Sequence, residues 1–316
     1  MKRIIMNADA IGGLSFSETA RPQPLPHQSL VKTTAFSLNR GEIGFAQSQN
    51  AKGRPIGWDY VGTIEETAAD GSGPPPGTRV VGWRPEMDAF AEYVIGDSQY
   101  LAPIPEAIAD VQAATLPVAG LTALAAVDKG DQILGRSVLV TGITGGVGFF
   151  ALQLAKLSGA RAVAQVRRPE QAGFAEQIGA DAVVVTADGP GLDREGPYRL
   201  VIDGIGGNLL GQLLKVTDKG GRLVCYGVSG SADASFNLHP DLFGKGGRRQ
   251  IYGLSLYSEV EIEPSAVALG RLLRLIESQR LQLPKITTAD WSETPKIASD
   301  LLNRKFSGKA VLTIPQ

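Results

Sequence analysis

The stretch Ser137-Val-Leu-Val-Thr-Gly-Ile-Thr-Gly-Gly-Val-Gly-Phe-Phe-Ala-Leu-Gln-Leu-Ala-Lys156 decides the fold. A β-type apolar run ends at Thr141, glycines follow at every third position, and a helix-like pattern of apolar residues begins at Val147. Glycines in such a turn let diphosphate oxygens approach backbone N–H groups, and the helix N-terminus adds positive dipole potential there. The pattern predicts a dinucleotide-binding strand–turn–helix. A tight turn without a ligand is the alternative.

Downstream of this motif, strand-like and helix-like runs alternate to about residue 256, which is typical of βαβ units in a parallel sheet. Before residue 110 the chain instead shows short β-rich runs punctuated by proline and glycine, which indicates a mostly β domain. The tail is predicted to hold helices over 264–279 and 292–303 and a strand over 310–314. The predicted fold class is α/β, with a doubly wound parallel sheet of six strands at 137–141, 161–166, 182–185, 200–203, 222–226 and 250–254.

The composition is that of an ordinary globular protein. The chain has 316 residues, and 31 Lys and Arg against 32 Asp and Glu leave a net charge of −1, so no global charge calls for nucleic acid or an anionic membrane. One cysteine, Cys225, leaves no intrachain disulfide or cysteine-rich zinc site. No apolar stretch reaches the roughly 18 residues of a membrane helix, and the first apolar run is too short for a signal peptide. The predicted location is cytoplasmic.

Two arginines follow the second predicted strand of the parallel sheet. NAD sites usually carry Asp or Glu at this place, about 20 residues after the glycines. Here Arg167 and Arg168 stand there, and the first acid is Glu170. Guanidinium groups would bind a 2′-phosphate, whereas an acid would repel it. The sequence therefore predicts NADPH, and the alternative is a pair of arginines that only point into solvent.

Short motifs occur in a fixed order along nearly the whole chain, including Ser37-Leu-Asn-Arg-Gly-Glu42, Gly57-Trp-Asp-Tyr-Val-Gly62, the glycine turn and Ser307-Gly-Lys-Ala-Val-Leu312. Together they resemble the zinc-independent medium-chain dehydrogenases/reductases of the quinone oxidoreductase type, related to zeta-crystallin and to enoyl reductases. The resemblance implies a GroES-like β-rich catalytic domain over 1–117 and 262–316 and an NADPH-binding Rossmann domain over 118–261. It also implies a homodimer formed through the last Rossmann strand.

Zinc-dependent relatives hold a catalytic zinc with two cysteines and a histidine, and the resemblance matches those positions to Asn39, Trp58 and Ala119. None of these is a usual zinc ligand. The two histidines, His27 and His239, each stand beside proline with no cysteine or histidine at ligand spacing. No metal site is predicted.

Without a metal, the resemblance implies hydride transfer from NADPH to a small electrophile, a quinone or an α,β-unsaturated carbonyl. Asn39 would face nicotinamide and substrate, where its amide could donate to an enolate oxygen; a turn-forming asparagine is the alternative. Tyr60 is a second catalytic candidate, as a proton donor, and the alternative is a core tyrosine. The tyrosine that some quinone reductases carry just after the Asn39 motif is absent, with Gly44 and Phe45 in its neighbourhood, which leaves solvent as a proton source.

Loops at the carboxyl ends of parallel strands bind ligands in this architecture, and they supply the remaining cofactor candidates. Lys309 matches a position where relatives place a cation on the diphosphate; a solvated lysine is the alternative. The predicted cofactor-binding residues are Asn39, Thr122, Gly142, Thr144, Gly145, Gly146, Val147, Gly148, Arg167, Arg168, Gly204, Gly206, Gly227, Val228, Ser229 and Lys309.

Two other functions fit the same residues. The missing tyrosine favours a module that binds NADPH as a sensor or structural element with little turnover. A biosynthetic enoyl reductase acting on a carrier-linked or CoA-linked chain would need a cationic entrance, for which the basic cluster over 245–249 is the candidate.

Overall fold

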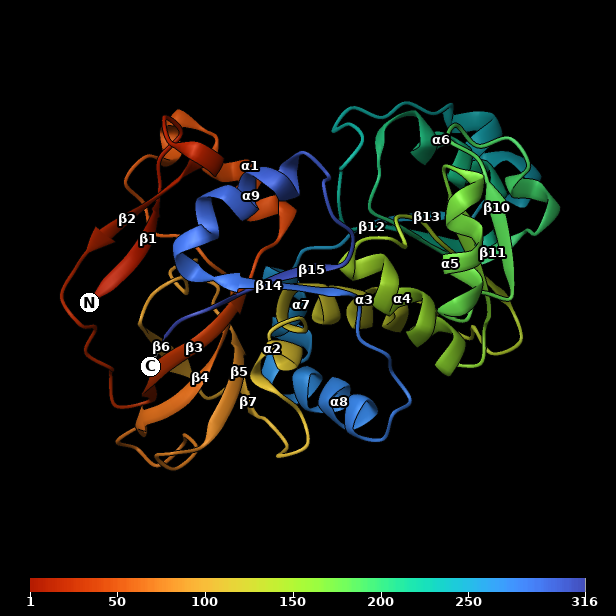
Figure 1. The fold of residues 1–316 in the computed structure, drawn as a ribbon. Coiled ribbons are helices and arrows are strands. Elements are labelled where there is room, and N and C mark those ends of the chain that lie inside the picture. Colours follow the sequence, from red (N-terminus) through yellow and green to blue (C-terminus); the bar gives the residue numbers. More distant parts are fainter. Residues whose placement is uncertain (316) are drawn as a thin grey trace. The chain divides into compact units, whose positions relative to one another are not determined.

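The computed structural model describes residues 1–315, which form two compact units (Figure 1). Unit 1 consists of residues 1–121 and the chain from Val260 onward, and unit 2 of residues 122–259. The domain boundaries predicted after residues 117 and 261 stay a prediction, and Gln316, at the end of the predicted catalytic domain, lies outside the described residues.

Unit 1 is built on a mostly antiparallel sheet in the order β14-β15-β3-β4-β5-β7, with β6 paired to β3. The tail strand β15 enters this sheet between β14, to which it is parallel, and β3. A separate antiparallel pair is formed by β1 (Lys2–Met6) and β2 (Leu14–Glu18). The sheet strands are β3 (Gln28–Ser37), β4 (Asp59–Glu66), β5 (Arg79–Trp83), β6 (Tyr93–Asp97), β7 (Leu101–Pro103), β14 (Ile286–Asp290) and β15 (Lys309–Thr313).

Strand β4 has a hydrophobic face and a polar face. Successive side chains of a strand point to opposite faces, so Tyr60 and Ile64 enter a hydrophobic core with Val31 and Val80, while Asp59 points the other way. The helices of unit 1 are α1 (Arg40–Ala46), α2 (Asp110–Ala113), α8 (Ser265–Glu277) and α9 (Thr294–Leu302), and α3 (Pro117–Asp128) and α7 (Leu256–Ile262) cross the unit boundaries.

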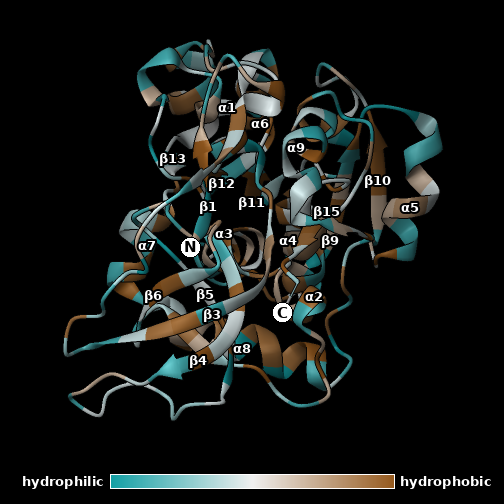
Figure 2. Ribbon diagram, turned by 60° about the vertical axis from the view of Figure 1, so that its left-hand side comes forward, coloured by the Kyte–Doolittle hydropathy of each residue, from teal (hydrophilic) through white to brown (hydrophobic). Residues whose placement is uncertain are grey.

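Unit 2 is a parallel six-stranded sheet in the order β10-β9-β8-β11-β12-β13. This order confirms the predicted α/β class with a doubly wound sheet. The central strands β8 and β9 are almost fully buried, as expected of a parallel sheet with both faces covered, whereas the edge strand β13 is mostly exposed. The other edge strand, β10, is apolar along its whole length and is brown in Figure 2. The strands are β8 (Ser137–Val140), β9 (Arg161–Val166), β10 (Ala182–Val185), β11 (Tyr198–Asp203), β12 (Thr217–Cys225) and β13 (Gln250–Gly253), and the helices are α4 (Gly146–Leu157), α5 (Ala172–Gln177) and α6 (Gly207–Val216).

All six predicted strands of unit 2 occur, whereas the strands β1, β2, β7 and β14 and the helices α1, α2, α3 and α7 were not predicted. The segment of β14, Ile286-Thr-Thr-Ala-Asp290, is half-buried over most of its length and pairs only with β15 at the sheet edge. An edge strand of this kind lacks the clean apolar alternation on which prediction relies.

Candidate functional site

The glycine turn of unit 2 brings helix α4 directly against the end of strand β8. Gly142 has φ of 64°, a left-handed conformation that favours glycine. A Cβ placed on Gly148 would lie 2.5 Å from the carbonyl oxygen of Gly142 and 2.8 Å from that of Thr141, so only a glycine permits this packing. The first N–H groups of α4, which have no partner inside the helix, are thereby held at the sheet edge as donors for an anion.

Asp203, at the end of β11, ties the next loop to the glycine turn. Its buried carboxylate accepts hydrogen bonds from Thr141 Oγ1 at 2.6 Å, from the Ile205 N–H at 3.1 Å and from the Gly206 N–H at 2.9 Å. Burial raises the pKa of Asp203. Sequence analysis did not assign Asp203 a role, although its position as the last residue of a parallel strand was a usable signal.

The loop after β12 completes this edge. Ser229 donates its hydroxyl to the Gly204 carbonyl at 2.8 Å and its N–H to the same oxygen at 3.1 Å.

Tyr226 was also missed by the sequence analysis. Its ring lies against Gly204, where a Cβ would be 2.4 Å from the phenol oxygen, and that oxygen is 3.7 Å from the Cβ position of Gly142. Among residues 1–315 the Tyr226 hydroxyl has no hydrogen-bond partner, and burial raises its pKa, so it stays a neutral donor beside both glycine loops.

Arg167 and Arg168 follow β9, the neighbour of β8, at the same end of the sheet. Both are exposed, and their backbone N–H groups each donate to Gln171 Oε1 at 3.2 Å, which fixes the turn that carries them. Within the described residues neither guanidinium forms an ion pair.

The structure therefore gathers most predicted cofactor residues of unit 2 at the carboxyl edge of β9, β8, β11 and β12. Val228 is 54% exposed on the loop after β12. Thr122 is buried in α3, at the start of unit 2. The other two predicted cofactor residues, Asn39 and Lys309, belong to unit 1.

In unit 1, the amide oxygen and the amide nitrogen of Asn39 both form hydrogen bonds to a cluster of buried charged side chains, Lys309, Asp59 and Glu42. Lys309 Nζ donates to Asn39 Oδ1 at 2.6 Å, and Asn39 Nδ2 donates to Asp59 Oδ2 at 2.9 Å and to Glu42 Oε1 at 3.1 Å. Asp59 also accepts from the Ser37 hydroxyl at 2.6 Å. Both amide hydrogens of Asn39 are thus donated inside unit 1, so a substrate oxygen would have to take the place of one carboxylate.

Lys309 is buried, which speaks against the solvated-lysine alternative. Its side chain is 4% exposed. Its Nζ lies 3.4 Å from Asp59 Oδ2 and donates to the Leu38 carbonyl at 3.1 Å in addition to Asn39. A bond to a cofactor diphosphate would have to replace one of these contacts and stays a prediction.

Glu42 is the second buried carboxylate of the cluster. It accepts from the Asn39 N–H at 2.7 Å and from the Trp58 N–H at 3.0 Å, and it packs with these donors at the start of α1. Burial, followed by the nearby Asp59 carboxylate, raises the pKa of Glu42 to about 8, against the opposing effects of Lys309 and of the two N–H donors.

This raised pKa predicts a pH-dependent stability. An unfolded chain releases the Glu42 proton near the ordinary value of 4.5 whereas the folded chain keeps it to about 8. The folded state binds more protons between those values, so its Glu42 contribution to the free energy of unfolding falls as pH rises through them. Glu42→Gln cannot titrate, and urea unfolding of both proteins from about pH 5 to 8 should show the wild-type value falling relative to the variant. Parallel curves would contradict this assignment.

Tyr60 lies on the opposite face of β4 from the charge cluster. Its side chain is 0% exposed, and its hydroxyl packs against Gly82 and Gly96, at 2.3 and 3.0 Å from their Cβ positions. The hydroxyl is buried without a hydrogen-bond partner within residues 1–315, and burial raises its pKa. This placement favours the core-tyrosine alternative over a proton donor.

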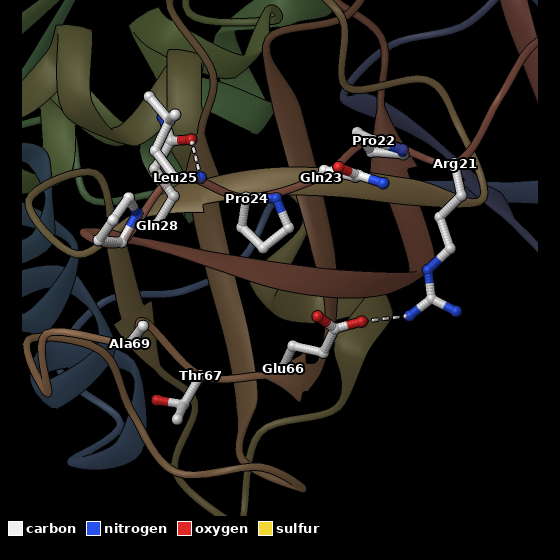
Figure 3. Close-up of a pocket in the computed structure, with 10 residues that line it drawn as sticks. Arg21, Pro22, Gln23, Pro24, Leu25, Gln28, Glu66, Thr67 and Ala69 are labelled. Atoms are coloured by element: carbon white, nitrogen blue, oxygen red, sulfur yellow. Dashed lines mark hydrogen bonds and ion pairs between the residues drawn. The ribbon is translucent and has the colours of Figure 1, made fainter.

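An open groove on unit 1 contains none of the predicted site residues (Figure 3). Its volume is about 640 Å³, and one ion pair crosses it, from Arg21 to Glu66 at 3.0 Å. Neither a nucleophile nor an acid–base pair is present, so the groove supports no catalytic assignment. Its lining residues are Arg21, Pro22, Gln23, Pro24, Leu25, Pro26, Gln28, Glu66, Thr67 and Ala69.

Neither a cluster of metal ligands nor a membrane-spanning helix occurs among the described residues. Over residues 1–315, no group of three or more His, Cys, Asp or Glu side chains is placed to hold a metal ion. No helix in that range has the length and apolar character needed to cross a membrane.

The chain is similar to several known proteins. A family model described as zinc-binding dehydrogenase matches residues 146–271. Quinone oxidoreductase-like protein 2 of Mus musculus is 31% identical over 235 residues, covering 70% of this chain and 67% of the relative. The Streptomyces orinoci spectinabilin polyketide synthase system protein NorB is 28% identical over 298 residues, covering 92% of this chain but 13% of that protein. This chain thus spans about an eighth of that relative's length.

Among solved structures, an Escherichia coli quinone oxidoreductase complexed with NADPH superposes with a TM-score of 0.87 at 21% identity. The match covers 99% of this chain and 100% of that one, so the two proteins share their fold. Asn39, Trp58 and Ala119, which the resemblance matches to zinc-ligand positions, lie outside the residues that this family model matches.

Proposed function

This chain belongs to the medium-chain dehydrogenase/reductase superfamily and is quinone oxidoreductase-like, and from that premise we propose that it is an NADPH-dependent reductase of quinones or α,β-unsaturated carbonyls that works without a metal. The loop edge of unit 2 carries the proposal. Three features lie at that end of the sheet. They are the N–H donors of α4, the loop after β11 that Asp203 bonds to the glycine turn, and two arginines that form no ion pair among the described residues. The NADPH complex of the Escherichia coli relative supports the choice of cofactor.

Unit 2 would hold the cofactor through groups of matched charge. The Gly148 packing leaves the N–H groups of α4 open to a diphosphate, and the dipole of the helix adds to their attraction. Arg167 and Arg168 would bind the 2′-phosphate through charge-assisted hydrogen bonds. The Tyr226 hydroxyl, a neutral donor beside Gly142 and Gly204, would bond a ribose or carboxamide oxygen.

When bound, NADPH supplies the hydride, and the chain supplies orientation and polarity. Asn39 would donate an amide N–H to the substrate oxygen on which negative charge develops. For that, one of its two N–H groups must leave Glu42 or Asp59. The carboxylates and Lys309 keep the amide in one orientation. Solvent is the proton source, because Tyr60 is enclosed in the core.

A paired titration with NADPH and NADH, followed by addition of a quinone and an enone, tests the proposal. We expect NADPH to bind at least about tenfold more tightly than NADH and to be oxidised by one of the acceptors. Binding without oxidation by either class would overturn the reductase assignment and favour the sensor function.

Removing the two arginines should abolish the cofactor preference. Arg167→Ala with Arg168→Ala removes both partners of the 2′-phosphate, and we expect NADPH affinity to fall about tenfold to a hundredfold while NADH affinity changes little. Arg194→Ala, an exposed arginine elsewhere in unit 2, is the matched control. If the double variant still prefers NADPH, the two arginines point into solvent and another group binds the 2′-phosphate.

The enoyl reductase alternative gains support from the polyketide synthase match. It would need the basic cluster over 245–249 to bind a carrier or CoA. Of that cluster, Arg249 is buried and donates to the Thr217 and Asp241 carbonyls at 2.6 and 2.8 Å, so it is not an entrance group, and the side chain of Lys245 lies outside the described part. We therefore keep this function second. A homodimer through β13 and a cytoplasmic location stay predictions.

A further inference from the structure

We propose that Glu42 holds one amide hydrogen of Asn39 and releases it to the substrate oxygen when the Glu42 carboxylate takes up a proton from solvent, so that Glu42 is a pH-dependent positioning residue. This role rests on the proposed function, in which Asn39 donates to that oxygen, and it assigns the hydrogen that does so. Glu42 acts through Asn39 and does not itself touch the substrate.

Lys309 fixes the direction in which the Asn39 amide points. An ammonium group has three donors and no acceptor, so the amide atom 2.6 Å from Lys309 Nζ is the oxygen. Both amide hydrogens therefore face carboxylates, Asp59 Oδ2 at 2.9 Å and Glu42 Oε1 at 3.1 Å. The half-buried Asn39 is the most exposed member of this cluster, and its two carboxylate partners hold both hydrogens.

The two carboxylates differ in their partners. Asp59 Oδ2 lies 3.4 Å from the Lys309 ammonium, so this carboxylate has a cation beside it. Glu42 forms no ion pair within residues 1–315. Besides the amide, its donors are two neutral backbone N–H groups, Asn39 at 2.7 Å and Trp58 at 3.0 Å. Because a buried charge without a counter-ion is costly, Glu42 is the carboxylate that takes up the proton.

A proton on Glu42 releases a hydrogen of Asn39. Glu42 Oε1 accepts from both the backbone N–H and the amide of Asn39, and a proton on this oxygen leaves room for only one of them. The backbone bond is the shorter and belongs to the fixed start of α1, so the amide hydrogen is the one released. Proton uptake also removes a negative charge beside Asn39, which favours the charge that develops on the substrate oxygen.

Two charged groups act on Glu42 from other strands. Burial is the largest influence and raises the pKa of Glu42 to about 8. Asp59 of β4 adds to this rise, and Lys309 of β15 opposes it. The change in protonation therefore falls within a pH range in which kinetics can be measured.

The other elements packed against α1 direct their charges elsewhere. On α9, Lys296 and Asp300 pair with each other at 3.0 Å. On α1 itself, the Arg40 guanidinium donates to the carbonyls of Leu301 and Leu302 at 3.1 Å each. The two short turns beside α1 contain no charged residue within their bounds, Ile11–Gly13 and Gln49–Ala51.

A pH profile of NADPH oxidation tests this role. We expect wild-type kcat/KM for the uncharged acceptor 3-buten-2-one to be about tenfold lower at about pH 9 than at about pH 7. Glu42→Gln cannot titrate, and its kcat/KM should change less than about twofold over this range. Glu106→Gln, at an exposed glutamate of unit 1, is the control and should keep the wild-type fall. A flat wild-type profile, or an equal fall in Glu42→Gln, would overturn the inference.

Magnetic resonance separates failure of this role from failure of the proposed function, because it needs no turnover. In protein labelled at asparagine nitrogen, the side-chain amide signal of Asn39 is identified by its absence in Asn39→Ala. We expect this signal to shift between about pH 7 and about pH 9 in wild type and to stay in place in Glu42→Gln. If wild type does not oxidise NADPH with 3-buten-2-one or a quinone, the reductase function fails, and the signal still decides about Glu42. The same behaviour in both proteins would overturn the release of the hydrogen.

Discussion

Replacing Gly148 by alanine should destabilise unit 2 and weaken NADPH binding at least about tenfold. The new Cβ would lie 2.5 Å from the Gly142 carbonyl oxygen and 2.7 Å from its carbonyl carbon. Both are backbone atoms, so the helix must move away from β8 and carry its N–H donors out of position. Overpacking of this kind costs about 1–3 kcal/mol. Thermal unfolding and a fluorescence titration with NADPH measure the two effects.

Gly173→Ala is the matched control for this substitution. Gly173 lies in α5 of the same unit, is exposed, and has open space around its Cβ position. Alanine there should stabilise the protein by up to about 1 kcal/mol through helix propensity and leave NADPH affinity unchanged. If Gly148→Ala behaved like Gly173→Ala in both measurements, the glycine turn would not be the close contact on which the cofactor assignment depends.

Lys309→Met should destabilise the protein by about 3–5 kcal/mol, because it leaves the buried Asp59 carboxylate without its cation. Lys309 Nζ lies 3.4 Å from Asp59 Oδ2 with side chains 4% and 0% exposed, so solvent cannot replace the lost partner. Asn39 and Leu38 lose a hydrogen-bond donor in the same step. Urea unfolding measures the loss, and methionine keeps the length of the side chain.

A double-mutant cycle with Asp59→Asn identifies the cause. Asparagine removes the charge and keeps one oxygen, which can accept from either the Ser37 hydroxyl, now bonded to Oδ2, or the Val118 N–H, now bonded to Oδ1. Because the two charges are removed together, the double variant should cost at least about 1 kcal/mol less than the sum of the single variants. Additive costs would show that Lys309 and Asp59 do not act as a pair.

The strands of unit 2 were predictable because their signal is local. β8 and β10 are short apolar runs between turn residues, and the run before Gly142 ends where β8 ends, to within one residue. Parallel strands covered on both faces need no partner information to be recognised. The strands β14, β1 and β2 were not predicted, because each is defined by its pairing with another segment and not by its own sequence pattern.

The site residues, like the strands, were predictable where their signal is local and were missed where it depends on distant segments. The residues at the strand ends of unit 2 could be named from the sequence, since parallel topology brings carboxyl ends to one edge. Tyr226 and Asp203 were missed because their roles depend on which loop each side chain crosses. Tyr60 and Asp59 are adjacent in sequence, and only the strand's orientation shows that one enters the core and the other the charge cluster.

By itself, the sequence determined the βαβ architecture and the glycine turn, because these depend on periodicity and residue identity. Only the tertiary structure decided that Lys309, Asn39 and Asp59 form one buried cluster. Lys309 is separated from Asn39 by 270 positions, and a contact between a tail strand and the end of β3 exists only once the sheet has formed. Burial makes the charges of Lys309 and Asp59 depend on each other, and the uncharged, half-buried Asn39 is hydrogen-bonded to both.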